Sequence, residues 1–82
     1  MSMKKADSRE TFDRTIAFYE DMIEDYIGKN DFVIARNFYH EMTGASYLAS
    51  RLGIIDDMTD YNNAWFQRIQ EAQFGRSGGA KV

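Results

Sequence analysis

Four carboxylates stand together in the segment EDMIED, and they have the clearest potential for chemistry. They are Glu20, Asp21, Glu24 and Asp25. In a helix, residues four apart share one side, so these acids form two pairs on neighbouring sides. A metal site in a helical bundle would also want Glu-x-x-His motifs that point inward, and the sequence has none. We interpret the four acids as a solvated face. The functional alternative is a docking surface for a basic partner, and a metal site is the remaining option.

His40 is the only histidine, and the chain has no cysteine. A catalytic histidine needs a pocket and a partner that orients it, and the adjacent Glu41 would point to a different side of a helix. The glycine-bearing SGGAKV follows the last predicted helix, whereas a phosphate-binding loop opens one. We therefore expect no enzymatic activity and no cofactor, with His40 at the surface.

The segment YLASRLGIIDD resembles the corner of a helix-turn-helix protein. Four residues match that corner: Ala49, Leu52, Gly53 and Ile54. The match then fails, because Ile55 stands where a polar cap is usual. Thr59 and Asn62 stand where a recognition helix buries apolar side chains. We interpret the segment as a glycine-capped turn between two helices.

The charge pattern also argues against nucleic acid. The net charge is −3, and the helix after this corner would begin with Asp56, Asp57 and Asp60, which repel phosphates. No apolar run approaches the roughly 18 residues of a membrane span, and the N-terminus lacks the apolar core of a secretory signal. We expect a cytoplasmic protein that binds neither nucleic acid nor membrane.

The first helix is predicted over residues 8–28. Asp7 and Glu10 have the spacing of a capping box, and Gly28 suits the left-handed position after a helix end. The apolar stripe has steps of three and four: Phe12, Ile16, Tyr19, Ile23 and Tyr26.

The second helix is predicted over residues 31–52, with Asn30 or Asp31 as its cap and Gly53 as its end. Its stripe has small residues at its centre: Phe32, Ala35, Tyr39, Met42, Ser46 and Ala49. Leu52, the last residue before the glycine, is expected to be buried.

The third helix is predicted over residues 57–74. Asp56 or Asp57 would start it, and Gly75 would end it. Its stripe again follows helical spacing: Met58, Tyr61, Trp65, Ile69 and Ala72.

Three amphipathic helices with short turns predict an all-α, antiparallel three-helix bundle. It forms one domain over residues 8–75, with flexible ends at 1–7 and 76–82. The alternative fold is a helical hairpin that dimerises through surplus aromatic side chains. The chain has five tyrosines, six phenylalanines and one tryptophan, which is many for one small core.

Some of these apolar side chains lie off the predicted stripes and would form a contact surface. We predict partner-binding roles for Phe18, Tyr47, Leu48 and Phe66. The acids Glu20, Asp21, Glu24 and Asp25 are the candidate residues of the alternative, electrostatic surface.

The segment EMTGASYLASRLGIIDDMTDYNNAW is similar to small uncharacterised helical proteins encoded on conjugative elements and phages of Gram-positive bacteria. The shared features are an alanine-rich helix, LG with an apolar pair, an acidic helix start and a tyrosine. The resemblance covers about a third of the chain. It implies an accessory protein of a mobile element and no particular activity.

The sequence therefore predicts a small, non-enzymatic adaptor or regulator that binds a protein partner, with a homodimer as one option. The second hypothesis is an acidic inhibitor or nucleic-acid mimic that binds a basic partner through the first helix.

Overall fold

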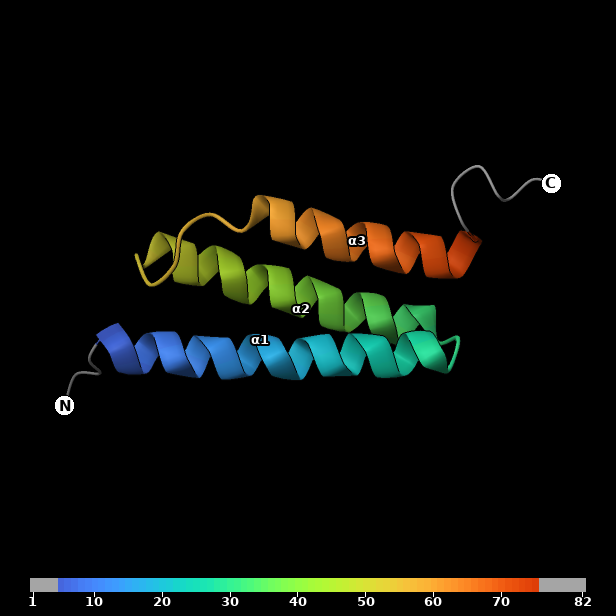
Figure 1. The fold of residues 1–82 in the computed structure, drawn as a ribbon, viewed down its shortest axis with the longest axis horizontal. Helices are drawn as coiled ribbons and strands as arrows, with labels where there is room; N and C mark the ends of the chain where they lie inside the picture. The colour runs from blue at the N-terminus through green and yellow to red at the C-terminus, as the bar shows by residue number, and fades with distance from the viewer. Residues whose placement is uncertain (1–4, 76–82) are drawn as a thin grey trace.

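The fold is three antiparallel helices, as predicted. The computed structural model describes residues 5–75. These residues form α1 (Lys5–Gly28), α2 (Phe32–Arg51) and α3 (Thr59–Phe74), and α2 lies between the other two in Figure 1. Since α2 and α3 run antiparallel side by side, the corner between them lacks the crossed geometry of a DNA-reading motif. Within the described part of the chain, no helix is long and apolar enough to cross a membrane.

The first helix begins earlier than predicted. It starts at Lys5, so Asp7 lies inside its first turn and does not cap it. Residues 5–7, which were predicted to belong to the N-terminal segment, are part of this helix. A carboxylate in the first turn stabilises the positive end of the helix dipole there, so helix can form without the capping box. The rest of the predicted flexible ends, 1–4 and 76–82, lies outside the described residues.

The turn between α1 and α2 depends on Asn30, where Gly28 was expected. Gly28 is helical, whereas Asn30 has a φ of 58°. The amide of Asn30 donates to the carbonyl of Ile27 (3.0 Å), and the amide of Asp31 donates to that of Tyr26 (2.9 Å). These two bonds form a Schellman motif, in which the left-handed residue is usually glycine and sometimes asparagine.

The two later helices start differently. Asp31 caps α2 as predicted, since its carboxylate accepts a hydrogen bond from the amide of Ile34 (3.2 Å). The third helix begins at Thr59, two residues later than predicted. Asp57 nevertheless stabilises the start of α3, because its carboxylate accepts a hydrogen bond from the backbone amide of Thr59 (3.2 Å).

The end of α2 repeats the Schellman motif. Gly53 has a φ of 77°, which confirms its predicted role. Its amide donates to the carbonyl of Ser50 (3.1 Å), and the amide of Ile54 donates to that of Ala49 (2.9 Å). The chain therefore leaves α2 abruptly and turns back towards α3.

Leu52 is exposed, and the prediction that it is buried was wrong. Its side chain is 65% exposed, whereas Ile55 is only 9% exposed and belongs to the core. The reason is the reversal at Gly53, which carries Ile55 back under the end of the bundle. Leu52 projects from the α1–α2 side of the helix end.

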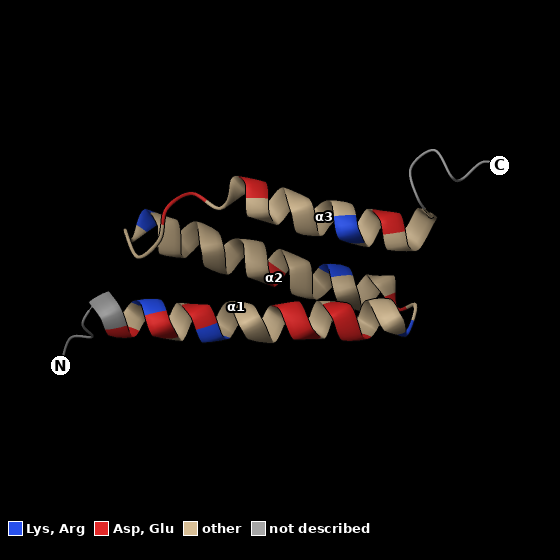
Figure 2. Cartoon of the chain, in the orientation of Figure 1, with Lys and Arg blue, Asp and Glu red and all other residues tan. Residues whose placement is uncertain are grey.

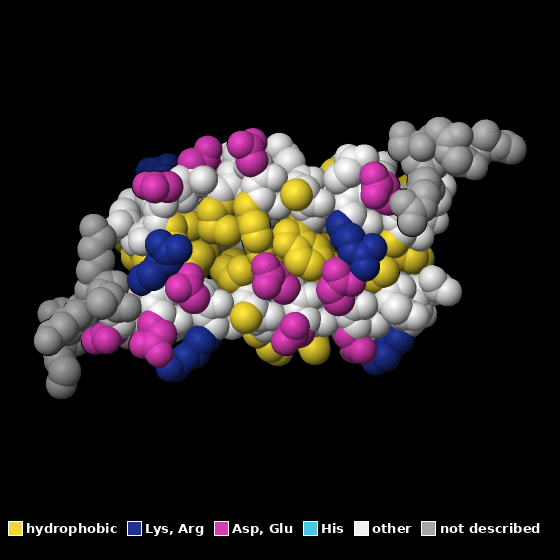
Figure 3. All heavy atoms as spheres, in the orientation of Figure 1, with side chains coloured by type: hydrophobic (Ala, Val, Ile, Leu, Met, Phe, Trp, Pro, Cys, Tyr) yellow, Lys and Arg dark blue, Asp and Glu magenta, His cyan; other side chains and the backbone are white. Residues whose placement is uncertain are grey.

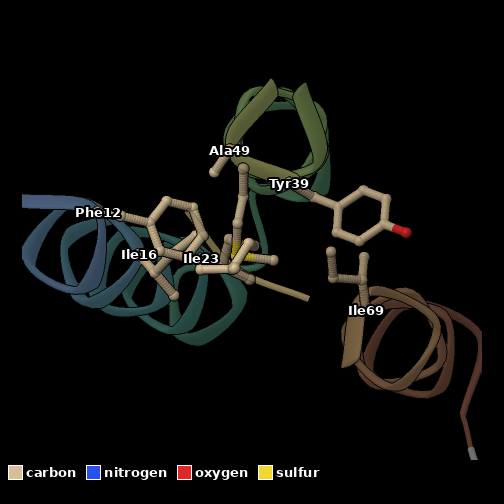
Figure 4. Close-up of a cluster of buried hydrophobic side chains, with 8 residues drawn as sticks. Phe12, Ile16, Ile23, Tyr39, Ala49 and Ile69 are labelled. Carbon is tan, nitrogen blue, oxygen red and sulfur yellow. The ribbon is translucent and has the colours of Figure 1, made fainter. Parts of the chain in front are cut away.

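The core is built from the predicted stripes. Ile23 of α1, Met42 of α2 and Ile69 of α3 are fully buried and bring the three helices together. Figure 4 shows Phe12 and Ile16 of α1 directed towards the α2 side that carries Ala49. The small residues of α2 thus admit the larger side chains of α1.

A polar network fixes α3 against α2. The Tyr39 hydroxyl donates to the backbone carbonyl of Asn62 (3.1 Å), and the side-chain amide of Asn62 donates to the Ser46 hydroxyl (3.0 Å). Ser46 in turn donates to the carbonyl of Thr43 (3.0 Å). Such bonds tolerate little displacement, so the network sets the position of α3 along α2.

Candidate functional site

Glu20 and Glu24 face α3, where they bridge two helices. The Tyr61 hydroxyl donates to Glu20, and Nε of Arg68 donates to Oε2 of Glu24 (3.0 Å). Figure 3 shows this seam as a band of hydrophobic side chains between α1 and α3, bordered by acidic and basic ones. Two of the four predicted docking carboxylates are therefore already engaged within the chain.

Asp21 and Asp25 point away from α3 and are exposed. Asp25 pairs with Lys29, whose Nζ lies 3.0 Å from its carboxylate. Figure 2 shows that acidic residues are concentrated on α1, but they occupy different sides of it. The acids thus divide into two sets: Glu20 and Glu24 bind α3, whereas Asp21 and Asp25 lie on an outward edge where Asp25 pairs with Lys29.

Three phenols are held in their protonated form. Burial and the hydrogen bond to Glu20 raise the pKa of Tyr61 far above its ordinary value. Burial raises the pKa of Tyr39, and burial together with Glu41 raises the pKa of Tyr19. Ionising these groups would place a new charge in poorly hydrated surroundings or beside a carboxylate.

We expect the protein to lose stability in alkali. As the pH rises past about 10, the unfolded chain loses its phenolic protons before the folded chain does, so the free energy of unfolding falls. Urea unfolding followed by circular dichroism at several pH values measures this decline. Tyr61→Phe should make the decline shallower, because it removes the most strongly perturbed of the three phenols. A Tyr61→Phe decline as steep as that of the wild type would contradict the assignment.

Tyr47 and Phe66 are exposed but lie apart from each other. Tyr47 projects from the outer side of α2, where Nη1 of Arg51 donates to its hydroxyl (2.8 Å). Phe66 lies at the α2–α3 edge, with the Arg36 guanidinium 5.8 Å from its ring centroid. Each ring has a partner within the chain, and they do not form one surface.

Phe18 and Leu48 lie on the face formed by α1 and α2 on the side away from α3. We call this the α1–α2 face. Their side chains are 52% and 59% exposed. Phe18 belongs to an aromatic cluster in which its ring lies 6.1 Å from that of Phe38, and Tyr26 stacks on Phe38 at 5.9 Å. The cluster occupies the middle of the face.

A groove of about 260 Å³ continues this face towards the start of α1. Its floor is Phe12 and Ala49, and its lining is almost entirely apolar. Along α2 it is bordered by Ala45, Leu48 and Leu52. Along α1 it is bordered by three small polar residues, Ser8, Thr11 and Thr15. The two exposed leucines therefore border one side of the groove. The shorter side chains of Ser8, Thr11 and Thr15 form a low wall on the opposite side.

The chain matches no protein-family model, and no curated protein or solved structure is significantly similar to it. The site is thus interpreted from its own geometry. Among residues 5–75, no three histidine, aspartate or glutamate side chains gather where they could hold a metal ion. His40 is exposed on the outer side of α2, with its ring 5.6 Å from that of Tyr39.

Sequence analysis did not single out the α1 side of the groove, because its residues, Ser8, Thr11 and Thr15, are small and polar. The spacing nevertheless carried a signal. Steps of three and four join Ser8, Thr11, Thr15, Phe18 and Met22 on α1. The same steps join Ala45, Leu48 and Leu52 on α2. Two such lines on an antiparallel pair of helices, displaced from the core stripes, mark a second face.

Proposed function

We propose that this protein is a small, non-enzymatic interaction module, an adaptor or regulator, that binds a protein partner through the α1–α2 face. The groove carries this proposal, since Leu48 and Leu52 expose apolar surface beside an unfilled hollow. Exposed apolar surface of this kind is characteristic of contact sites. The exposure of Phe18 extends the surface along α1.

The shape of the groove suits a helix as its ligand. Two antiparallel helices present a channel into which a further helix lays apolar residues spaced by three and four. The aromatic cluster would supply rigid contact area, which is typical of residues that dominate binding energy. From the resemblance suggested by residues 41–65, we further propose that this protein is a cytoplasmic accessory protein of a conjugative element or phage.

The alternative, an acidic inhibitor or nucleic-acid mimic, rests on Asp21 and Asp25. Glu20 and Glu24 contribute less to it because they bind Tyr61 and Arg68. The two hypotheses differ in their response to salt. At about 1 M salt the Debye length is ~3 Å, so an electrostatic complex dissociates while an apolar one persists.

Affinity capture from the native host tests the proposal. Wild-type protein and Val33→Asp should recover the same partner at low and high salt, whereas Leu48→Asp should not recover it. Val33 is the control, because it is an apolar residue of α2 that is exposed at least as much as Leu48 but lies on the outer side, away from the groove. Equal recovery by Leu48→Asp would contradict the proposal. Recovery lost at high salt and in Asp21→Asn with Asp25→Asn would favour the acidic alternative.

A further inference from the structure

The α1–α2 face carries both a protrusion and the hollow that would receive it. Leu48 and Leu52 stand out from α2, and the low wall of Ser8, Thr11 and Thr15 lies directly across the groove on α1. A surface with both features side by side can be complementary to itself, as a two-fold interface requires.

We propose that the α1–α2 face binds the same face of a second copy of this chain, about a two-fold axis parallel to the helices. This inference rests on the assignment of that face as the contact surface. The axis places α1 of each copy against α2 of the other at the same height. Leu48 and Leu52 of one copy then cover the low wall of the second copy's groove.

The same two faces could also pack about a two-fold axis that runs across the helices. The charges at the edges of the face distinguish the two arrangements. The outward edge of α1 is acidic on balance: it has one base among four acids, and Lys29, just beyond the helix, pairs with the last of them. These residues are Asp7, Glu10, Arg14, Asp21 and Asp25. The outward edge of α2 carries Arg51 and His40 and has no acid. An axis parallel to the helices sets the acidic edge beside the α2 edge. An axis across the helices would instead set the two acidic edges together, which is repulsive.

The size of the face is adequate for a dimer. A 24-residue α1 is about 36 Å long, and two adjacent helices are about 20 Å wide, which gives roughly 700 Å² per copy. Standard interfaces bury about 800 Å² per partner. The result would be a four-helix contact with the aromatic clusters of both copies at its centre.

Glu41 is the one acid near the middle of this face, on the α2 side that carries Phe38 and Ala45. It is exposed, and its carboxylate interacts with the Tyr19 hydroxyl, which contributes to the raised pKa of that phenol. The protonated phenol of Tyr19 is a potential hydrogen-bond donor to this carboxylate, and such a bond would lower the cost of removing the carboxylate from water.

Sedimentation velocity tests the proposal on the full chain. The wild type and Phe74→Asp, a control at an exposed apolar residue of α3 away from this face, should sediment as dimers at about 100 μM and dissociate on dilution. Leu48→Asp and Thr11→Arg, one from each side of the groove, should weaken association by at least roughly tenfold with helix content unchanged by circular dichroism. A wild-type monomer at that concentration would overturn the proposal, as would dimers that both variants leave intact.

The direction of the axis is tested separately with a spin label, since the chain has no cysteine of its own. Asp56→Cys places the label at the exposed corner after α2. A parallel axis sets both labels at the same end of the dimer, so the distance between them is short. The crossed axis separates them by roughly a helix length, ~30 Å or more, and that result would overturn the arrangement.

The two proposals can fail independently. A monomer whose partner capture is still abolished by Leu48→Asp would refute the dimer and support the interaction module. A dimer broken by Leu48→Asp, with a captured partner that is unaffected, would support the dimer and refute the proposed partner site.

Discussion

Replacing Met42 with alanine is expected to lower the free energy of unfolding by about 2–5 kcal/mol, because the change removes a fully buried side chain and leaves a cavity. Met42 lies where the stripes of all three helices meet, so no single helix can move to fill the space. A chain of this length has a total stability on the order of 4–12 kcal/mol, of which this loss is a large part. Urea unfolding followed by circular dichroism measures it.

The matched control is Val33→Ala on the same helix. Val33 is 73% exposed, so its truncation should change the free energy of unfolding by less than about 0.5 kcal/mol. If Met42→Ala cost no more than Val33→Ala, the three helices would not converge on Met42 and the packing described above would be incorrect.

Placing a charge at Ile55 is expected to be equally severe. Ile55→Asp buries a carboxylate that has no partner, which costs on the order of 3–5 kcal/mol and should leave much of the protein unfolded. Leu52→Asp, three residues earlier, should have little effect on the stability of the dilute monomer, since Leu52 is exposed. Thermal unfolding at low concentration compares the two variants, and the reverse ranking would restore the sequence-based expectation.

Most of the α1 and α2 parts of the core could be predicted from spacing alone, whereas Ile55 lies outside every predicted stripe and only Ile69 of the α3 stripe is buried. Every residue of the predicted α2 stripe from Ala35 to Ala49 is buried, and so are Phe12, Ile16 and Ile23. This works because a helix repeats every 3.6 residues wherever it packs. The prediction that Leu52 is buried was wrong because the exposure of this residue depends on where the chain reverses direction. Gly53 turns the chain at that point, and Ile55 fills the space that Leu52 was expected to fill.

The candidate site was predictable only in part. The exposure of Phe18 and Leu48 followed from their positions off the stripes, but the groove between their helices depends on how α1 and α2 are set side by side. The pairing of Glu20 with Tyr61 spans 41 residues and depends on the position of α3. No local pattern contains that information. Asn30 was predicted only as a possible cap of the second helix and not as the left-handed residue of the turn, because glycine is the commoner left-handed residue and Gly28 is close by.

The two Schellman corners have a consequence for how such a protein can diverge. At Asn30 and at Gly53 the helix is ended by hydrogen bonds within the backbone itself. The ends of α1 and α2 therefore do not depend on which side chains the surface carries. Substitutions on the proposed contact surface, the α1–α2 face, would then leave both corners and the positions of the helices intact. Selection can thus reshape recognition and leave the scaffold unchanged.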